Sequence, residues 1–117
     1  MASARLRLRN CTTGEVIAQR VVCPTAAWQR AWGFLGRRSV DPAEGLWFER
    51  CAAIHTLGMR ACIDIVFVDR GQTVVRIVPR AARNRIFPGG AHAAATLELG
   101  PGVTEARIRV GDRLQLE

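Results

Sequence analysis

The chain of 117 residues contains no lysine and no tyrosine, and aromatic residues make up only 6% of it. All 17 basic side chains are therefore arginines, which against 10 acidic residues give a net charge of +7. Arginine in place of lysine, together with abundant alanine and glycine, indicates GC-rich coding DNA. Proteins that bind single strands usually combine basic residues with exposed aromatic side chains. The chain's aromatic residues look instead like core residues, namely Trp28, Trp32, Trp47 and Phe48.

The chain also lacks a long apolar segment. No stretch approaches the roughly 18–20 apolar residues that a membrane-spanning helix needs. The N-terminal segment alternates arginine with leucine and has no continuous apolar core of the kind found in signal peptides. We therefore expect a cytoplasmic protein without a membrane span.

Closely spaced cysteine pairs are absent as well. The four cysteines form no C-x-x-C motif and are expected to be reduced, small hydrophobic residues; they are Cys11, Cys23, Cys51 and Cys62. Cys51, His55 and Cys62 could supply three zinc ligands, but structural zinc sites usually have four ligands in tight pairs. The sequence therefore predicts no metal and no cofactor.

What is present indicates a single domain, residues 1–117, that is large enough to bury a core without disulfides. Strict alternation in Arg5–Arg9 and the apolar character of Val16–Val22 predict a β-hairpin, with the arginines facing outward from a half-buried or edge strand. The helical spacing of Trp28, Trp32 and Leu35 predicts one short helix near residues 25–36. The other expected strands are Leu46–Phe48, Ala53–Leu57, Ile63–Asp69, Thr73–Pro79, Thr96–Leu99 and Arg113–Leu116.

The strand from Thr73 to Pro79 should return antiparallel to Ile63–Asp69, because Arg70-Gly71 is a turn sequence. Residues 82–92 are rich in Gly, Pro and Asn and are expected to form a long flexible loop. Residues 103–108 fit either a helical turn or a strand. The fold class predicted is mainly β with a minor α+β character: a compact β-sandwich or partly open barrel of short, mostly antiparallel strands.

Several segments together resemble a known family. They are Trp28–Leu35 with Arg37, Glu44-Gly45-Leu46, Ile54-His55-Thr56 with Gly58-Met59, Ile63-Asp64 with Phe67, Leu97-Glu98-Leu99 with Gly102, and Gly111-Asp112. In this order and spacing the chain resembles the domain of unknown function 192 family of small prokaryotic proteins. The resemblance implies a compact, mainly β domain of the sandwich type, and it implies no established activity.

The most unusual polar residue is Asp64, which lies in an apolar strand that is expected to be central. A buried carboxylate must accept hydrogen bonds. Asp64 could anchor the loop 57–62 through Arg60 or through backbone N–H groups. Alternatively, it could accept a hydrogen bond from a ring N–H of His55, which would leave the second nitrogen of that ring available as a base or for ligand binding.

Our leading hypothesis is a small-molecule binding module whose pocket surrounds the IHTxGM and ID motifs. Met59 and Trp47 would form its apolar wall, and His55, Thr56 and Asp64 its polar end. Glu98 alternates with Leu97 and Leu99 and is expected to be exposed or at the rim of the cavity.

Two alternatives remain open at this point. The first is a hydrolase-like enzyme that uses His55 with Asp64 or Cys51, although no complete catalytic motif is present. The second is an interaction protein that binds nucleic acid or an acidic partner through a basic patch, made of Arg76, Arg80, Arg83 and Arg85. No particular oligomeric state is predicted.

Overall fold

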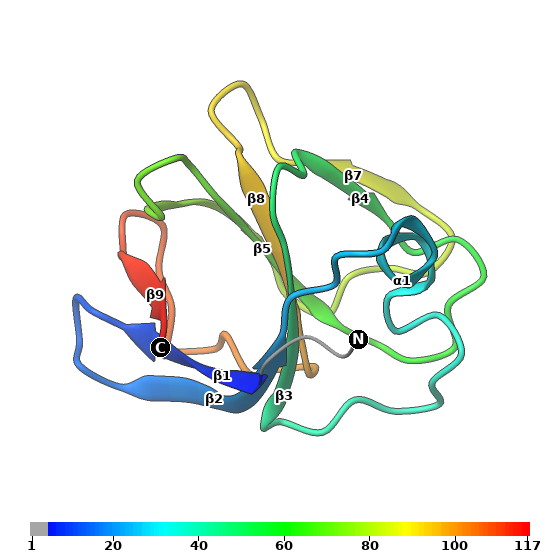
Figure 1. Ribbon diagram of the computed structural model, residues 1–117, viewed down its shortest axis with the longest axis horizontal. Helices are drawn as coiled ribbons and strands as arrows, with labels where there is room; N and C mark the ends of the chain where they lie inside the picture. The colour runs from blue at the N-terminus through cyan, green and yellow to red at the C-terminus, as the bar shows by residue number, and fades with distance from the viewer. Residues whose placement is uncertain (1–4) are drawn as a thin grey trace.

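The computed structural model describes residues 5–117, whose regular structure consists mainly of short strands joined by turns and loops (Figure 1). Residues 1–4, the start of the segment in which no signal peptide was expected, lie outside the described part. The strands are β1 (Arg5–Asn10), β2 (Val16–Val22), β3 (Glu44–Phe48), β4 (Ala53–His55), β5 (Asp64–Val68), β6 (Val74–Val78), β7 (Ile86–Pro88), β8 (Ala95–Leu99) and β9 (Leu114–Leu116). The helix α1 (Ala27–Trp32) lies between β2 and β3.

Seven strands form one curled sheet in the order β6-β5-β8-β3-β2-β1-β9, and β4 pairs with β7 in a small second sheet. All neighbouring strands are antiparallel except β2 and β3, which are parallel. The two edges of the large sheet meet where Val74 N–H donates to the carbonyl of Asp112 at 2.8 Å and Gly111 N–H donates to the carbonyl of Val74 at 2.9 Å. These bonds involve the first residue of β6 and the segment before β9, so the curled sheet is a half-barrel whose two edges are linked at one end. The predicted mainly β fold is confirmed, and so is the antiparallel return of β6 along β5.

The large sheet carries a hydrophobic core on each face. The inner core contains Val66 and Val68 of β5, whereas the outer core contains Ile65 and Phe67 of the same strand. Because successive side chains of a strand point to opposite faces, β5 is buried on both sides. The expectation that this strand is central is confirmed, since β5 lies between β6 and β8.

The outer core is covered by α1 with the segment that follows it and by the small β4–β7 sheet, which lie together on one side of the large sheet (Figure 1). Phe34 follows α1, Ile54 belongs to β4 and Phe87 to β7, and all three pack against the outer core. This covering layer is not continuous, and the candidate site described below lies within it.

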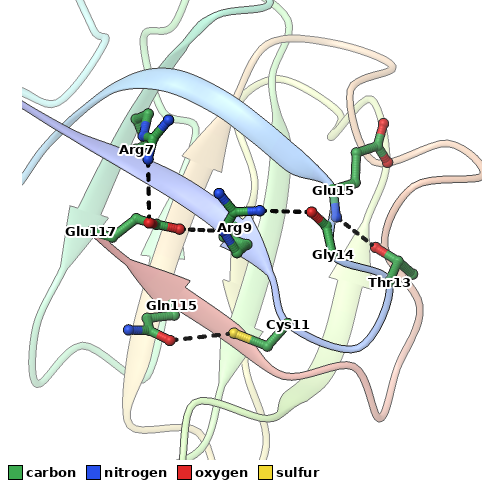
Figure 2. A network of polar contacts seen from close by, with 8 residues as sticks. All are labelled: Arg7, Arg9, Cys11, Thr13, Gly14, Glu15, Gln115 and Glu117. Atoms are coloured by element: carbon green, nitrogen blue, oxygen red, sulfur yellow. Dashed lines mark hydrogen bonds and ion pairs between the residues drawn. The ribbon is translucent and has the colours of Figure 1, made fainter.

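The strand β1 shows how alternation in the sequence becomes structure. Leu8 is completely buried in the inner core, whereas Arg7 is exposed, as predicted. β1 is not an edge strand, however, because β9 pairs with its second side. Arg7 and Arg9 both reach Glu117 just after β9, with an Arg7 Nη2–Glu117 Oε2 distance of 3.3 Å (Figure 2). The hydrogen bond from Arg9 is the main cause that lowers the pKa of the Glu117 carboxyl.

The helix prediction is not supported over its full length. Helical hydrogen bonding is confined to the six residues of α1, and Gly33 ends it with a positive φ of 52°. Residues 33–36 are turns. Trp32 is 57% exposed and is therefore not a core residue, whereas Trp47 and Phe48 are buried as expected. The side chain of Trp28 lies outside the described part of the structure.

The structure also defines the two segments 82–92 and 103–108. Residues 82–92 were expected to be a flexible loop, but Ile86–Pro88 forms β7 and pairs with β4. The pairing places Ile54 opposite Phe87, and burial of these two apolar side chains against the outer core stabilises β7. The Asn, Pro and Gly residues in and around β7 had instead favoured the prediction of a loop. Residues 103–107 form successive turns, which agrees with the helical-turn alternative and not with the strand.

Candidate functional site

A cavity of about 270 Å³ lies in the covering layer, between the segment that follows α1 and the small sheet. Its apolar lining comes from Phe34, Leu35, Phe48, Ile54 and Met59, and its polar lining includes Arg30, Cys51, His55 and Glu98. At about 30 Å³ for each water molecule, this volume holds about nine water-sized groups. The cavity is therefore suited to a small ligand.

Glu98 is the most unusual of the lining residues. On β8 it lies opposite Ile65 of β5 and Leu46 of β3, so its side chain belongs to the outer face of the sheet. Its neighbours Leu97 and Leu99 belong to the inner core. Glu98 was expected to be exposed or at the rim of the cavity. It is only 3% exposed, so the first alternative is wrong, and it lines the cavity from a buried position.

One carboxyl oxygen of Glu98, Oε1, is buried and has no hydrogen-bond partner within residues 5–117. Burial raises the pKa of this carboxyl from 4.5 to about 7, and a hydrogen bond from the backbone N–H of Phe34 lowers it only partly. Because a buried polar atom without a partner is costly, native structures rarely retain one without a reason. The carboxyl of Glu98 is thus available for a ligand that enters the cavity.

Gly33 keeps the space beside this oxygen open. A Cβ atom at Gly33 would lie 3.3 Å from Glu98 Oε1 and 3.5 Å from Phe48 Cζ. The positive φ at position 33 also favours glycine, because residues with a side chain rarely adopt this backbone conformation. The backbone turn that ends α1 therefore places no side chain between Gly33 and the Glu98 carboxyl or the Phe48 ring.

His55 lies on the cavity lining at the end of β4 and is exposed. Its Nδ1 accepts a hydrogen bond from the backbone N–H of Leu57 at 3.2 Å. In the neutral ring the proton is therefore on Nε2, which can donate to a ligand. Met59 is buried and lines the same cavity. Two of the five predicted binding residues are thus brought together here.

Asp64 does not join them. Its carboxylate accepts four hydrogen bonds: from the backbone N–H groups of Arg80, Gly102 and Thr104 at 2.8, 2.9 and 2.9 Å, and from the Thr104 hydroxyl at 2.6 Å. Alternation along β5 places Asp64 on the inner face with Val66, whereas His55 lies beside the outer core. The predicted His55–Asp64 contact is therefore wrong. Asp64 does anchor loops through backbone N–H groups, but these are the loops that follow β6 and β8, not the loop 57–62.

The other two predicted lining residues also serve the fold. The Thr56 hydroxyl donates to the carbonyl of Ala82 at 2.6 Å and accepts from Arg85 N–H at 3.1 Å, which holds the loop before β7. Trp47 belongs to the inner core, and its ring N–H donates to Glu49 Oε1 at 3.0 Å. Neither residue lines the cavity.

Cys51 lines the cavity near β4, and its thiol donates to the carbonyl of Ala53 at 3.1 Å. No cluster of three or more His, Cys, Asp or Glu side chains that could hold a metal ion occurs in residues 5–117. Likewise, the part of the chain that the structure describes has no helix long and apolar enough to cross a membrane.

The predicted basic patch is distributed over β6 and the segment that follows it. Arg76 donates from Nη1 to the carbonyl of Pro88, which ties β6 to β7. Arg80, Arg83 and Arg85 are exposed. At least one of the four guanidinium groups thus has a structural role.

A larger hollow of about 590 Å³ lies on the other side of Gly33 and Phe34, but its charged groups already satisfy one another. Arg37 forms a bidentate pair with Glu44 at 3.0 and 2.8 Å, and this hydrogen bonding lowers the pKa of Glu44. Arg20 of this hollow lies 3.6 Å from Asp41. The cavity at Glu98 is therefore the better candidate.

Comparison with known proteins places this arrangement in a family. The family profile of DUF192, described as uncharacterized ACR, matches residues 9–116. The chain belongs to the domain of unknown function 192 family. The resemblance inferred from the motifs is thus confirmed. The matched residues include Glu98, Gly33 and His55, so the whole cavity lies within the DUF192 domain.

Two solved structures are similar to the chain. One is a protein of unknown function from Novosphingobium aromaticivorans DSM 12444, with a TM-score of 0.80, 22% identity, and coverage of 97% of this chain and 84% of that one. The other is a protein from Sinorhizobium meliloti 1021 provisionally named a transcription regulator, with a TM-score of 0.85, 23% identity, and coverage of 99% and 96%. At these identities the likeness shows a shared fold alone. No curated protein matches the chain.

Proposed function

We propose that this DUF192 domain is a binding module for a small organic molecule, which occupies the cavity between α1 and the β4–β7 sheet. The observation that supports the proposal is Glu98 Oε1, a buried oxygen without a partner on the lining of a mostly apolar cavity. Ligand sites in proteins commonly combine an apolar lining with a few convergent polar groups. His55 at the exposed end supplies a second such group.

Among the residues that the structure describes, the carboxylate on the inner face of β5 is not available in the same way. Asp64, the other buried carboxylate on β5 and β8, has all its hydrogen bonds satisfied by the protein. A carboxylate whose oxygens both accept hydrogen bonds from the protein stabilises the fold, whereas a carboxyl with one oxygen that accepts none can gain a hydrogen bond from a ligand. The contrast between Asp64 and Glu98 therefore supports a binding site in the outer layer and not on the inner face.

The enzyme alternative keeps one supporting observation, which is that Cys51 and His55 line the same cavity. A cysteine nucleophile would need to act as a thiolate beside the imidazole, whereas the Cys51 thiol is turned to the carbonyl of Ala53. Binding without chemistry is therefore the function that the geometry supports better.

The test is an NMR fragment screen with the ¹⁵N-labelled protein, using small neutral and charged fragments. Binding should shift the amide signals of Gly33, Phe34 and Ile54, and the Glu98→Gln and His55→Ala variants should stay folded and bind the hits at least about tenfold more weakly. Glu105→Gln, a change of an exposed carboxyl outside the cavity, is the matched control. Fragments that bind elsewhere only, or that bind Glu98→Gln as tightly as the wild type, would contradict the proposal.

A further inference from the structure

The cavity also restricts the chemistry of its ligand. We infer that the group bound beside Glu98 is the ammonium of a small organic amine whose apolar body fills the rest of the cavity. This inference rests on the proposed function and makes it more specific. It is carried by the buried Glu98 oxygen, which has no partner among residues 5–117, together with the charges of the groups that line the cavity.

The space beside Gly33 has two features that suit an organic cation. A Cβ atom built on Gly33 would lie 3.3 Å from Glu98 Oε1 and 3.5 Å from Phe48 Cζ, so the carboxyl oxygen and the edge of the aromatic ring lie close together next to this glycine. The buried Oε1, which has no partner among the described residues, can accept a charge-assisted hydrogen bond from an ammonium, and the apolar edge of the ring beside it can pack against the hydrocarbon body of the ligand. An anionic group there would be repelled by Glu98, and a neutral group would leave the carboxylate charge without compensation.

The other ionisable side chains that line the cavity do not supply this positive charge. The guanidinium of Arg30 lies 5.9 Å from the centroid of Phe48 and donates to the carbonyl of Glu49 at 2.7 Å, so it is held at the edge of the cavity. His55 is occupied at Nδ1 by Leu57. Glu98 forms no salt bridge within the described residues, and the compensating charge can therefore come from a ligand.

A metal ion fits this site less well than an amine does. Hard cations such as Mg²⁺ and Ca²⁺ take six or more oxygen ligands, whereas Glu98 is the one carboxyl among the lining residues. An ammonium needs up to three hydrogen-bond acceptors, which one carboxylate and a few water molecules can provide. The remaining lining is apolar and includes Phe34, Leu35 and Met59, which matches a hydrocarbon body.

Amine binding should release a proton from the site. The ammonium pairs with the carboxylate form of Glu98, so a protonated Glu98 must give up its proton to solvent as the amine binds, while the amine keeps its own. With a Glu98 pKa of about 7 and an alkylamine that stays protonated, affinity should rise about tenfold between pH 6 and pH 8. His55 and Cys51 are the other titratable groups that face the cavity, and Arg30 stays charged.

The experiment compares matched amines and alcohols by NMR titration at pH 6 and pH 8. The pairs are benzylamine with benzyl alcohol, cyclohexylamine with cyclohexanol, and butylamine with butanol. At least one amine should bind about tenfold more tightly than its alcohol at pH 8, with shifts at Gly33 and Phe34. The advantage and the pH dependence should both disappear in Glu98→Gln but persist in His55→Ala, which excludes imidazole titration as their cause.

The outcomes separate the two proposals. If the alcohols bind the cavity as tightly as the amines, or other fragments bind there and no amine does, the ammonium inference is overturned and the binding module stands. If the pH dependence is lost in His55→Ala and kept in Glu98→Gln, the inference is also overturned. If neither these compounds nor any fragment of the screen shifts the cavity signals, both proposals fail.

Discussion

Replacing Glu98 by glutamine should make the protein more stable at neutral and alkaline pH. Glutamine has nearly the same shape and can still accept the hydrogen bond from Phe34 N–H, but it cannot ionise. The wild-type carboxyl is 3% exposed and has a pKa of about 7, against 4.5 for an unperturbed glutamate. The folded wild type therefore holds a proton over a pH range in which the unfolded chain has lost it.

The sign and size follow from proton linkage. Since the pKa of Glu98 is raised on folding, its ionisation costs stability progressively as the pH rises from about 4.5 to about 7, and the cost is constant above that range. At about 1.4 kcal/mol for each pH unit, the full cost is about 3 kcal/mol. Glu98→Gln avoids this cost, so its advantage in free energy of unfolding should grow from acid pH to about 3 kcal/mol at pH 8.

The assay is urea unfolding followed by tryptophan fluorescence, at intervals from pH 5 to pH 9, because Trp47 is buried and reports on the core. The quantity of interest is the difference between variant and wild type at each pH, which removes the pH dependence of all other groups. Glu105→Gln is again the control and should run parallel to the wild type. A Glu98→Gln advantage that does not change between pH 5 and pH 8 would refute the claim of a buried, uncompensated carboxyl.

Three other changes have expected outcomes. Asp64→Asn should lower the free energy of unfolding, measured in urea at pH 7, by about 3 kcal/mol, because the amide NH₂ group would face backbone N–H donors. A loss under about 1 kcal/mol would contradict the role of Asp64 as a buried hydrogen-bond acceptor. Gly89→Ala should destabilise the protein by about 1–3 kcal/mol, because the new Cβ would lie 2.5 Å from the Phe67 ring. The control Gly71→Ala should change stability by less than about 0.5 kcal/mol. Equal thermal midpoints for the two variants would be inconsistent with the predicted clash at Phe67. His55→Ala, an exposed position, should keep the urea midpoint within experimental error of the wild type, and a large shift would show that the ring supports the fold.

Much of the sheet could be predicted because the spacing of apolar residues along each strand agrees with the burial of those residues in the folded sheet. The alternation in Arg5–Arg9 and the apolar run around Asp64 both depend on short-range periodicity, which survives in the folded sheet. The burial of Asp64 and its backbone N–H partners could likewise be argued from the cost of a buried charge. Which loops supply those partners depended on the strand order β5–β8, which is a long-range property.

The candidate site was harder to predict because it depends on a second layer. Alternation correctly places the Glu98 side chain on the face of the sheet away from Leu97 and Leu99. It cannot show that this face is covered by the segment after α1 and by the β4–β7 sheet. β7 itself is three residues long and is flanked by turn residues. The signal that could have identified Glu98 is a charged residue in an otherwise apolar strand, which is the same argument that was applied to Asp64.

The single parallel pair in the sheet has a consequence for the cavity. Parallel neighbours cannot be joined by a tight hairpin, so residues 23–43 must travel across the sheet between β2 and β3. That excursion carries Gly33, Phe34 and Leu35, which form one side of the cavity. If the proposed binding function is correct, substitutions in this connection would alter the shape of the cavity without touching the strand pairs of the large sheet.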